Sequence, residues 1–446
     1  MNIGALLTGP LAIVVTLLIL AILVIAHELG HFFVARRLGV RVHEFGIGFP
    51  PRAAVLGKDR QGTLYTLNWL PIGGFVRLEG EYGGDRDDPR SFASQSFPRK
   101  AAILVAGVTV NLILAFLILT VVTAASDFSI AIKLGSEAPG TLAANLGLHA
   151  GDTIEAVDGR RFSAFDGGSA SPLSDLVGRT GSVTLSVRDA QGTVSDRTVD
   201  LDTAHGVRIG TVTPDSPASS AGLVAGDVLL AVDGHRFSVV RVSDAQAYLR
   251  SHASQQVTLS IQHADGSLAE IRTTLRGAED VAANRGALGV MFDAGNVGPA
   301  LGPAVHYDAA AAVRKGAERT FQALGLVIGA LGNLVNVVAT NPTQAPPVSG
   351  VVGIVFVIGG LIQAYPPVFL LWTAGVLSAN LALINILPIP PFDGGGIAVA
   401  GLQALFGERA TRPLVRFAQM LGVLVFVGLF VWVTFFDLLR GFGLLP

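Results

Sequence analysis

Long stretches without charged side chains constrain this chain more than any other feature of its sequence. Only 14% of the 446 residues are charged, whereas soluble proteins have about 25%. A membrane helix needs about 20 mostly apolar residues. Four stretches meet this requirement: from about residue 6 into residues 27–31, then 101–125, 366–387 and 417–436. The sequence therefore predicts a polytopic α-helical membrane protein with about four transmembrane helices and at least one polar domain.

A further apolar region precedes the third of these stretches. No Asp, Glu, Lys or Arg occurs between Thr320 and Phe392. Residues 321–338 are typical of an interfacial or packed helix, and 351–362 of a re-entrant segment. Five or six spans therefore stay open as alternatives.

The positions of Lys and Arg predict how the chain is oriented, because cytoplasmic loops carry an excess of both. Eleven of them lie between Arg36 and Lys100, and three more precede the last span. We therefore expect residues 38–99 and 388–416 to face the cytoplasm. Both termini and the long insert, residues 126–300, would then lie outside a plasma (inner) membrane. Residues 1–26 contain no Lys or Arg, so we expect the first span to be retained rather than cleaved as a signal.

Charge and cysteine content exclude some classes of partner and site. The net charge of −2 predicts no nucleic-acid partner. Cysteine is absent, which excludes a disulfide framework and a thiolate metal site.

The sequence His27-Glu28-Leu29-Gly30-His31 ends the first apolar stretch. On a helix this HExxH spacing places two imidazoles on one face, where both can bind Zn²⁺. The glutamate between them can act as general base toward water activated by the metal. Ionisable groups at membrane depth are costly and indicate function. A pair of histidines that only marks the membrane boundary is the alternative, and it leaves the spacing unexplained.

A catalytic zinc site takes three protein ligands, and Asp393 is the candidate for the third. It ends the sequence Asn385-Ile-Leu-Pro-Ile-Pro-Pro-Phe-Asp393, which Gly394 and Gly395 follow. The expected topology places Asp393 on the same side of the membrane as the two histidines. Without the HExxH sequence, a helix-capping Asp in a Pro-Gly turn would be the favoured interpretation.

The long insert contains an internal repeat. Residues 147–159 and 222–234 share the pattern G-L-x-x-G-D-x-[IL]-x-x-V-D-G at an offset of 75 residues. Each copy predicts an apolar strand followed by an Asp-Gly hairpin turn, and the pattern resembles bacterial PDZ domains. PDZ domains bind extended peptides, often peptide ends, at a sheet edge. Peptide binding and steric exclusion of bulky substrates both stay open.

Together these motifs resemble the site-2 protease family of intramembrane zinc metalloproteases, in its bacterial regulator-of-sigma-E branch with tandem PDZ domains. The resemblance implies that His27, His31 and Asp393 bind Zn²⁺ and that Glu28 is the catalytic base. It implies substrates with one membrane span, such as anti-sigma factors or signal-peptide remnants, cleaved in regulated intramembrane proteolysis. It also implies substrate-binding roles for Asn385 and Asn380 on the third span and for Gly73, Gly74 and Phe75 in a membrane-associated β-loop.

The sequence departs from the family pattern at two places. Val108 replaces a proline in the sequence Gly107 to Asn111, so Asn111 is equally well a polar residue of helix packing. Gly396 stands where many members have a histidine that is not a zinc ligand. A PDZ-bearing membrane scaffold without catalysis is the alternative function.

The expected organisation follows from these assignments. The spans 1–38, 100–125, 351–396 and 417–440 alternate with a cytoplasmic loop carrying a β-hairpin (39–99), two PDZ-like domains (126–204 and 205–280), a connecting segment with an interfacial helix (281–350) and a second cytoplasmic loop (397–416).

Overall fold

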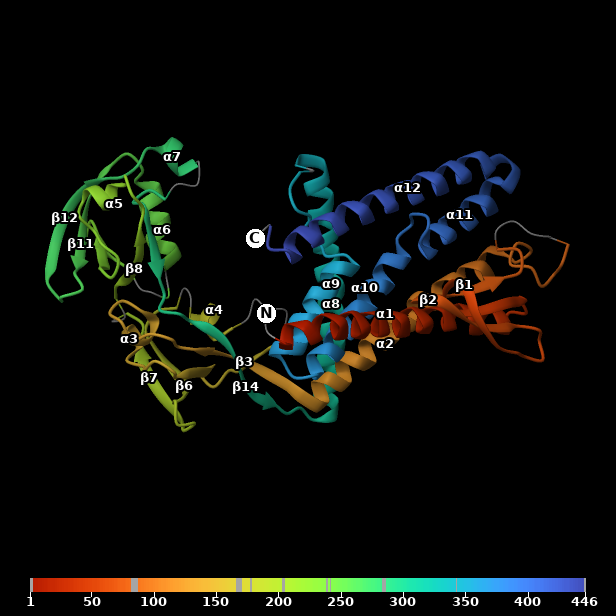
Figure 1. Ribbon diagram of the computed structural model, residues 1–446, viewed down its shortest axis with the longest axis horizontal. Helices are drawn as coiled ribbons and strands as arrows, with labels where there is room; N and C mark the ends of the chain where they lie inside the picture. Colours follow the sequence, from red (N-terminus) through yellow and green to blue (C-terminus); the bar gives the residue numbers. More distant parts are fainter. Residues whose placement is uncertain are drawn as a thin grey trace. The chain divides into compact units, whose positions relative to one another are not determined.

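The computed structural model describes residues 3–81, 87–165, 171–176, 179–202, 205–237, 240, 242–282, 286–341 and 343–444. The chain divides into two compact units (Figure 1). Residues 1–125 and 307–446 form a helical unit, and residues 126–306 form a β-rich unit. The β-rich unit is thus an insert between two halves of the helical unit.

Five helices in the described residues are long and apolar enough to cross a membrane. The four expected spans correspond to four of them, and the fifth, α8, covers residues 321–338, for which the sequence analysis left an interfacial helix and a further span open. A shorter apolar helix, α9, follows α8 where a re-entrant segment was expected. The helices of this unit are α1 (Ile3–Arg37), α2 (Phe97–Ser126), α8 (Ala309–Thr340), α9 (Val351–Ala364), α10 (Val368–Ile386), α11 (Asp393–Phe406) and α12 (Glu408–Gly441).

Helices α1 and α2 approach each other closely at two glycines. A Cβ atom on Gly30 of α1 would lie 2.6 Å from the carbonyl oxygen of Ala106 on α2. A Cβ atom on Gly107 of α2 would lie 2.5 Å from Nε2 of His31 on α1. Small residues let membrane helices come this close. The crossing therefore presses the HExxH turn of α1 against α2.

Strands β1 (Val42–Lys58) and β2 (Leu64–Leu78) are so long that each bends back and pairs twice. Residues 42–47 pair with 74–78 on one side and with 64–67 on the other, and residues 64–68 also pair with 52–58. The result is a four-part sheet in the order 74–78, 42–47, 64–68 and 52–58, in which residues 74–78 form one edge. Phe32, Phe45, Val76 and Ile103 join this sheet to α1 and α2 in a buried apolar cluster.

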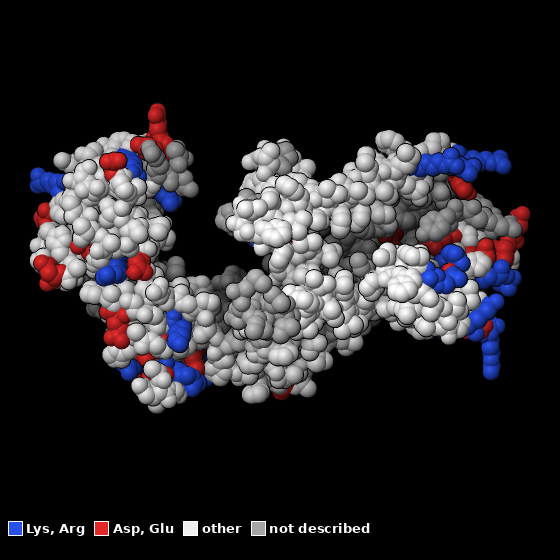
Figure 2. All heavy atoms as spheres, viewed as in Figure 1, with Lys and Arg blue, Asp and Glu red and all other residues white. Residues whose placement is uncertain are grey.

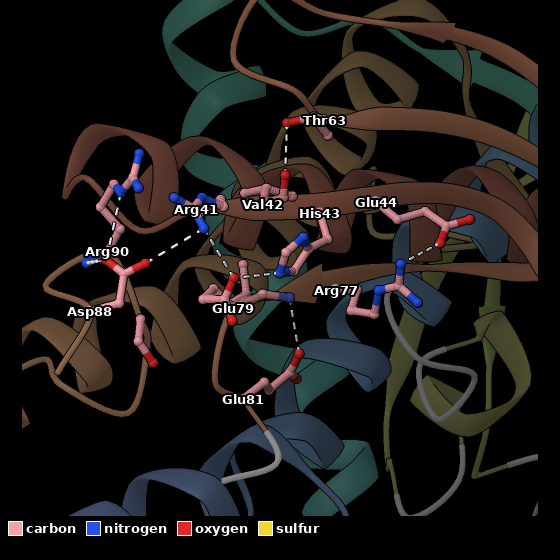
Figure 3. Close-up of polar contacts among 12 residues, drawn as sticks. Arg41, Val42, His43, Glu44, Thr63, Arg77, Glu79, Glu81, Asp88 and Arg90 are labelled. Carbon is pink, nitrogen blue, oxygen red and sulfur yellow. Dashed lines mark hydrogen bonds and ion pairs between the residues drawn. The ribbon is translucent and has the colours of Figure 1, made fainter. Parts of the chain in front are cut away.

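Charged side chains hold this sheet together away from the apolar cluster (Figure 3). Glu44 is buried and accepts a hydrogen bond from Arg52 at 2.7 Å, and Arg77 Nη2 lies 3.1 Å from its other oxygen. Glu79 pairs with His43 at 2.6 Å and with Arg41 at 3.4 Å. Figure 2 shows Lys and Arg gathered at the end of the helical unit that carries this sheet and the start of α12.

The turn between α10 and α11 depends on prolines and glycines. Proline cannot continue a helix, and α10 ends at Ile386, before the three prolines of residues 388–391. A Cβ atom on Gly394 would overlap the carbonyl of Ile386, and one on Gly395 would lie 2.4 Å from the nitrogen of Pro390, so neither residue can carry a side chain. Asp393 is therefore the first residue of a helix that begins directly against the end of α10.

The last turns of α12 are tied to the beginning of α9. Asp437 is buried and its Oδ2 accepts hydrogen bonds from the backbone N–H groups of Gly350 and Gly353, at 2.8 and 2.9 Å. Because Gly350 has no side chain that could cap α9, Asp437 supplies the cap from another helix. Arg440 donates to the carbonyl of Pro346.

The β-rich unit contains two sheets built on the sequence repeat. Each copy of the repeat ends in an Asp-Gly pair with positive φ at both residues: +49° and +72° at Asp158 and Gly159, and +50° and +79° at Asp233 and Gly234. This is the backbone of a two-residue hairpin turn that favours Asp-Gly. Each sheet covers its own buried apolar core.

The two sheets are nested in the sequence rather than consecutive. The first has the order β14-β3-β4-β6-β7, with β5 beside β3, and the second β12-β11-β9-β8-β13, with β10 beside β9. Strand β14, which follows the second sheet in the chain, pairs with β3 and completes the first. The first sheet and its helices are β3 (Asp127–Lys133), α3 (Leu142–Leu146), β4 (Thr153–Val157), β5 (Phe162–Ser163), α4 (Pro172–Leu176), β6 (Ser182–Arg188), β7 (Val194–Asp200) and β14 (Gly298–Val305).

The second sheet also extends past the boundary at residue 280 that the repeat suggested. Strand β13 pairs with β8 and lies in the segment expected to be a connection. Its elements are β8 (Val207–Val212), α5 (Pro217–Ser220), β9 (Val228–Val232), β10 (His235–Arg236), α6 (Val242–Ser251), β11 (Gln256–Gln262), β12 (Leu268–Thr274), α7 (Ala278–Ala282) and β13 (Val290–Asp293). The repeat signature covers only a turn and one strand, so it could not show where each sheet closes.

Candidate metal centre

The structure brings together His27 and His31 with Asp393, which lies more than 360 residues after them in the sequence. Helix α1 places the two imidazoles one turn apart, with 3.0 Å between their Nε2 atoms. Asp393, at the start of α11, places Oδ2 3.0 Å from His27 Nε2 and 3.4 Å from His31 Nε2. Both histidines are buried. Three electron-pair donors therefore meet at one point inside the helical unit.

The spacing and chemistry of these donors fit a zinc ion. Ligand atoms at 2.0–2.1 Å from a tetrahedral zinc ion lie about 3.3 Å from one another, close to the three separations observed. Asp393 Oδ2 is buried and has no hydrogen-bond donor among the described residues. Lone pairs that face one another without a proton between them repel, and a cation among them removes this repulsion.

Glu28 lies beside the same point. Its carboxylate and the imidazole nitrogens of His27 and His31 form a group whose ligand atoms all lie within 4.8 Å of one another. Glu28 is only partly buried. Its carboxylate therefore lies beside the point at which the three donors meet, and its role as general base stays a prediction.

Helix α2 supplies contacts around the histidines that the sequence analysis did not assign. His31 Nδ1 lies 2.8 Å from the carbonyl oxygen of Ile103, and His27 Nδ1 lies 3.4 Å from Nδ2 of Asn111. Gly107 lies between these two residues on α2, directly against both rings. The Gly107-x-x-x-Asn111 spacing was the sequence signal for this face, since residues four apart share one side of a helix.

The edge of β2 passes beside Glu28. A Cβ atom on Gly74 would lie 3.9 Å from Cγ of Glu28, and one on Gly73 would lie 3.2 Å from Val24 of α1. Phe75 and the residues after it pair with β1 on one side only. Among the described residues, no strand occupies the other side of residues 74–78. This open edge lies next to the three donors because β2 packs on α1.

The two asparagines expected to contact substrate lie on α10. Asn385 is half-buried near the end of that helix, and Asn380 is partly buried and has no hydrogen-bond partner for its Oδ1 among the described residues. Their substrate-binding roles stay a prediction.

This chain is similar to known proteases over most of its length. The sequence profile of peptidase family M50 matches residues 15–429. Protease RseP of Yersinia pestis is 28% identical over 450 residues, which cover 94% of this chain and 97% of the relative. A putative zinc metalloprotease of Xylella fastidiosa (strain Temecula1) is 28% identical over 449 residues, 94% and 96% of the two chains. Regulator of sigma-E protease RseP of Escherichia coli is 27% identical over 459 residues, 94% and 97%. The matched span includes all three converging side chains.

Proposed function

Because this chain belongs to peptidase family M50 and is a zinc metalloprotease of the membrane, we propose that it hydrolyses peptide bonds within or beside the transmembrane segments of single-span proteins in the inner membrane. The convergence of His27, His31 and Asp393 at the ends of apolar helices carries this proposal. Anti-sigma factors and signal-peptide remnants are the substrate classes, and the names of the relatives in Escherichia coli and Salmonella, regulators of sigma-E, support the first.

We assign zinc binding to His27, His31 and Asp393 and the role of general base to Glu28. Zinc held by these ligands would polarise the scissile carbonyl and activate a water molecule. Glu28 takes a proton from the attacking water and returns it to the leaving amine, so the carboxylate ends the cycle as it began. Its place on α1 between the two histidines keeps it on the same helix turn as the ligands.

The open edge of β2 is proposed to hold the substrate. A transmembrane helix hides its peptide bonds in its own hydrogen bonds, so cleavage requires local unwinding. An unwound segment can pair with a sheet edge, and residues Gly73, Gly74 and Phe75 begin such an edge beside Glu28. Asn385 and Asn380 on α10 would offer amide groups to the same extended backbone.

The two sheets of the β-rich unit are proposed to act as PDZ-like domains that bind peptide ends or exclude bulky substrates. Their open edges differ. Strand β14 at the edge of the first sheet contains Pro299 and Pro303, which lack the N–H that a new strand needs. Strand β13 at the edge of the second contains no proline. Peptide addition at β14 is therefore disfavoured, and of these two edges we assign it to β13.

Substitution of Glu28 tests the catalytic assignment. Glu28→Gln is expected to abolish cleavage of a co-expressed single-span substrate while zinc content and folding stay unchanged, because glutamine keeps the shape of the side chain but cannot accept the proton. Immunoblotting of the substrate and metal analysis of the purified protein measure the two effects. Glu318→Gln on α8, whose carboxylate is half-exposed, is the matched control and should cleave normally.

The alternative of a scaffold without catalysis predicts no difference between Glu28→Gln and the wild type, and cleavage by Glu28→Gln would refute the proposal. If Glu28→Gln is inactive, proteomics of membrane-derived peptides from wild-type and Glu28→Gln cells would identify the natural substrates.

A further inference from the structure

Each histidine of the metal centre has a second ring nitrogen, and both of these nitrogens face α2. A backbone carbonyl can only accept a hydrogen bond. His31 Nδ1, 2.8 Å from the carbonyl oxygen of Ile103, therefore carries its proton, and Nε2 keeps the lone pair that faces Asp393. A metal-binding histidine is usually fixed by such a partner for its other nitrogen.

His27 has no backbone carbonyl in the corresponding place. Its Nδ1 lies 3.4 Å from the side-chain amide of Asn111, which is 0% exposed. The amide nitrogen faces Nδ1, and the amide oxygen is buried with no hydrogen-bond partner among the described residues. A half-turn of the amide exchanges these two atoms. The oxygen then accepts a hydrogen bond from His27 Nδ1–H.

The backbone of Asn111 is contacted from α10. Ser378 on α10 is 0% exposed, and its hydroxyl donates a hydrogen bond of 2.8 Å to the backbone carbonyl of Asn111. Gly107, one turn earlier on α2, lets the imidazoles come within reach of that face. The side chain of Asn111 therefore lies on the face of α2 that meets His27.

We propose that Asn111 is a positioning residue that holds His27 in the tautomer with the proton on Nδ1, so that Nε2 is free to bind zinc. The inference rests on the proposed zinc site. It requires an acceptor atom at position 111 and no particular charge. A carboxylate at this position would therefore do the same work, whereas an apolar side chain of similar volume would leave His27 Nδ1–H buried without a partner.

Zinc affinity and the spectrum of the cobalt-substituted protein test this inference in the purified full-length protein. Asn111→Leu is expected to weaken zinc binding by about 10- to 100-fold in competition with a chelator, and to change the visible absorption of the Co²⁺ form. Asn111→Asp should keep the affinity within a few-fold of the wild type. Ser378→Ala removes a buried hydrogen bond to the same residue without touching its side chain, and should bind zinc normally.

Three outcomes would overturn the inference. Asn111→Leu could bind zinc like the wild type with an unchanged Co²⁺ spectrum, Asn111→Asp could lose as much affinity as Asn111→Leu, or Ser378→Ala could lose as much as either. The last two would reduce Asn111 to a packing residue. Failure of the wild-type protein to bind zinc would instead contradict the proposed function itself, so the two failures are distinguishable.

Discussion

Gly107 is where helix α2 leaves room for the two imidazoles of α1. A Cβ atom there would lie 2.5 Å from His31 Nε2 and 2.7 Å from His27 Cε1, so Gly107→Ala must displace both rings. We expect this substitution to weaken zinc binding about tenfold or more, the loss typical when the support of a ligand is disturbed. Chelator competition measures it. Gly325→Ala on α8, where an added Cβ meets nothing within 4 Å, is the control, and equal affinities of the two variants would contradict the prediction.

Among single residues, the sequence predicted the ionisable side chains of the site. It did not predict the residues of α2 that contact the two imidazoles. His27 and His31 follow from a spacing of four residues, and Asp393 from being the first charge after a long uncharged stretch. Both signals are local. The contact of Asn111 with His27 depends on which face of α2 meets α1. The sequence pattern does not predict this face, because both helices are apolar on all sides. Gly107 indicates only that another segment approaches α2 closely at this position.

The β1–β2 sheet is an element whose stability should depend on pH through Glu44. Burial raises the pKa of Glu44, but hydrogen bonds from Arg52 and Thr66 and the charge of Arg77 outweigh this effect and hold the pKa below its ordinary value of 4.5. The unfolded sheet then binds a proton more readily than the folded one. Stability from this group is present above about pH 4.5 and is lost as the pH falls through the lowered value.

We therefore expect the loop between β1 and β2 to become more sensitive to proteolysis as the pH falls below 4.5, measured by limited digestion with an acid-active protease in detergent. Glu44→Gln cannot titrate, and its sensitivity should change less over the same range while being higher at pH 7. If the wild type and Glu44→Gln respond identically to acid, Glu44 does not stabilise the sheet in this way.

Elements whose signals are local were predictable, and those completed from a distance were not. The end of α10 follows from three prolines. Helix α11 was not predicted, because the sequence analysis placed its residues 393–406 at the end of a span and in a cytoplasmic loop. The Asp-Gly turns of the repeat likewise follow from residues 158–159 and 233–234. Residues Gly298–Val305, which form β14, were expected to lie in a connecting segment. Nothing in their sequence predicts that they pair with β3. Pairing across an inserted sheet is a tertiary property.

At the scale of the whole molecule, α8 is long enough to span a membrane, and we propose that it instead lies along one surface. Arg319, in its first half, donates to Thr123 near the end of α2, and the segment after α8 is bound by Arg440 at the end of α12. Figure 1 shows α8 running across the direction of α1 and α12. Helix α9 has 14 residues, about 21 Å at 1.5 Å per residue, too short for a core of about 30 Å. If α8 crossed the membrane and α9 did not, α10 would cross in the opposite direction. Asp393, which follows α10, would then lie on the other side of the membrane from the two histidines.

Single-cysteine labelling tests this topology, and the absence of native cysteine makes the chain a clean background. Ala190→Cys in the β-rich unit and Gln344→Cys after α8 are both at exposed positions and should react with a membrane-impermeant maleimide on intact spheroplasts. Gln61→Cys, at the exposed turn between β1 and β2, should react only after lysis, because the Lys and Arg residues around it predict a cytoplasmic position for that sheet. Labelling of Gln344→Cys only after lysis would show that α8 crosses the membrane, and labelling of Gln61→Cys on intact spheroplasts would reverse the proposed orientation.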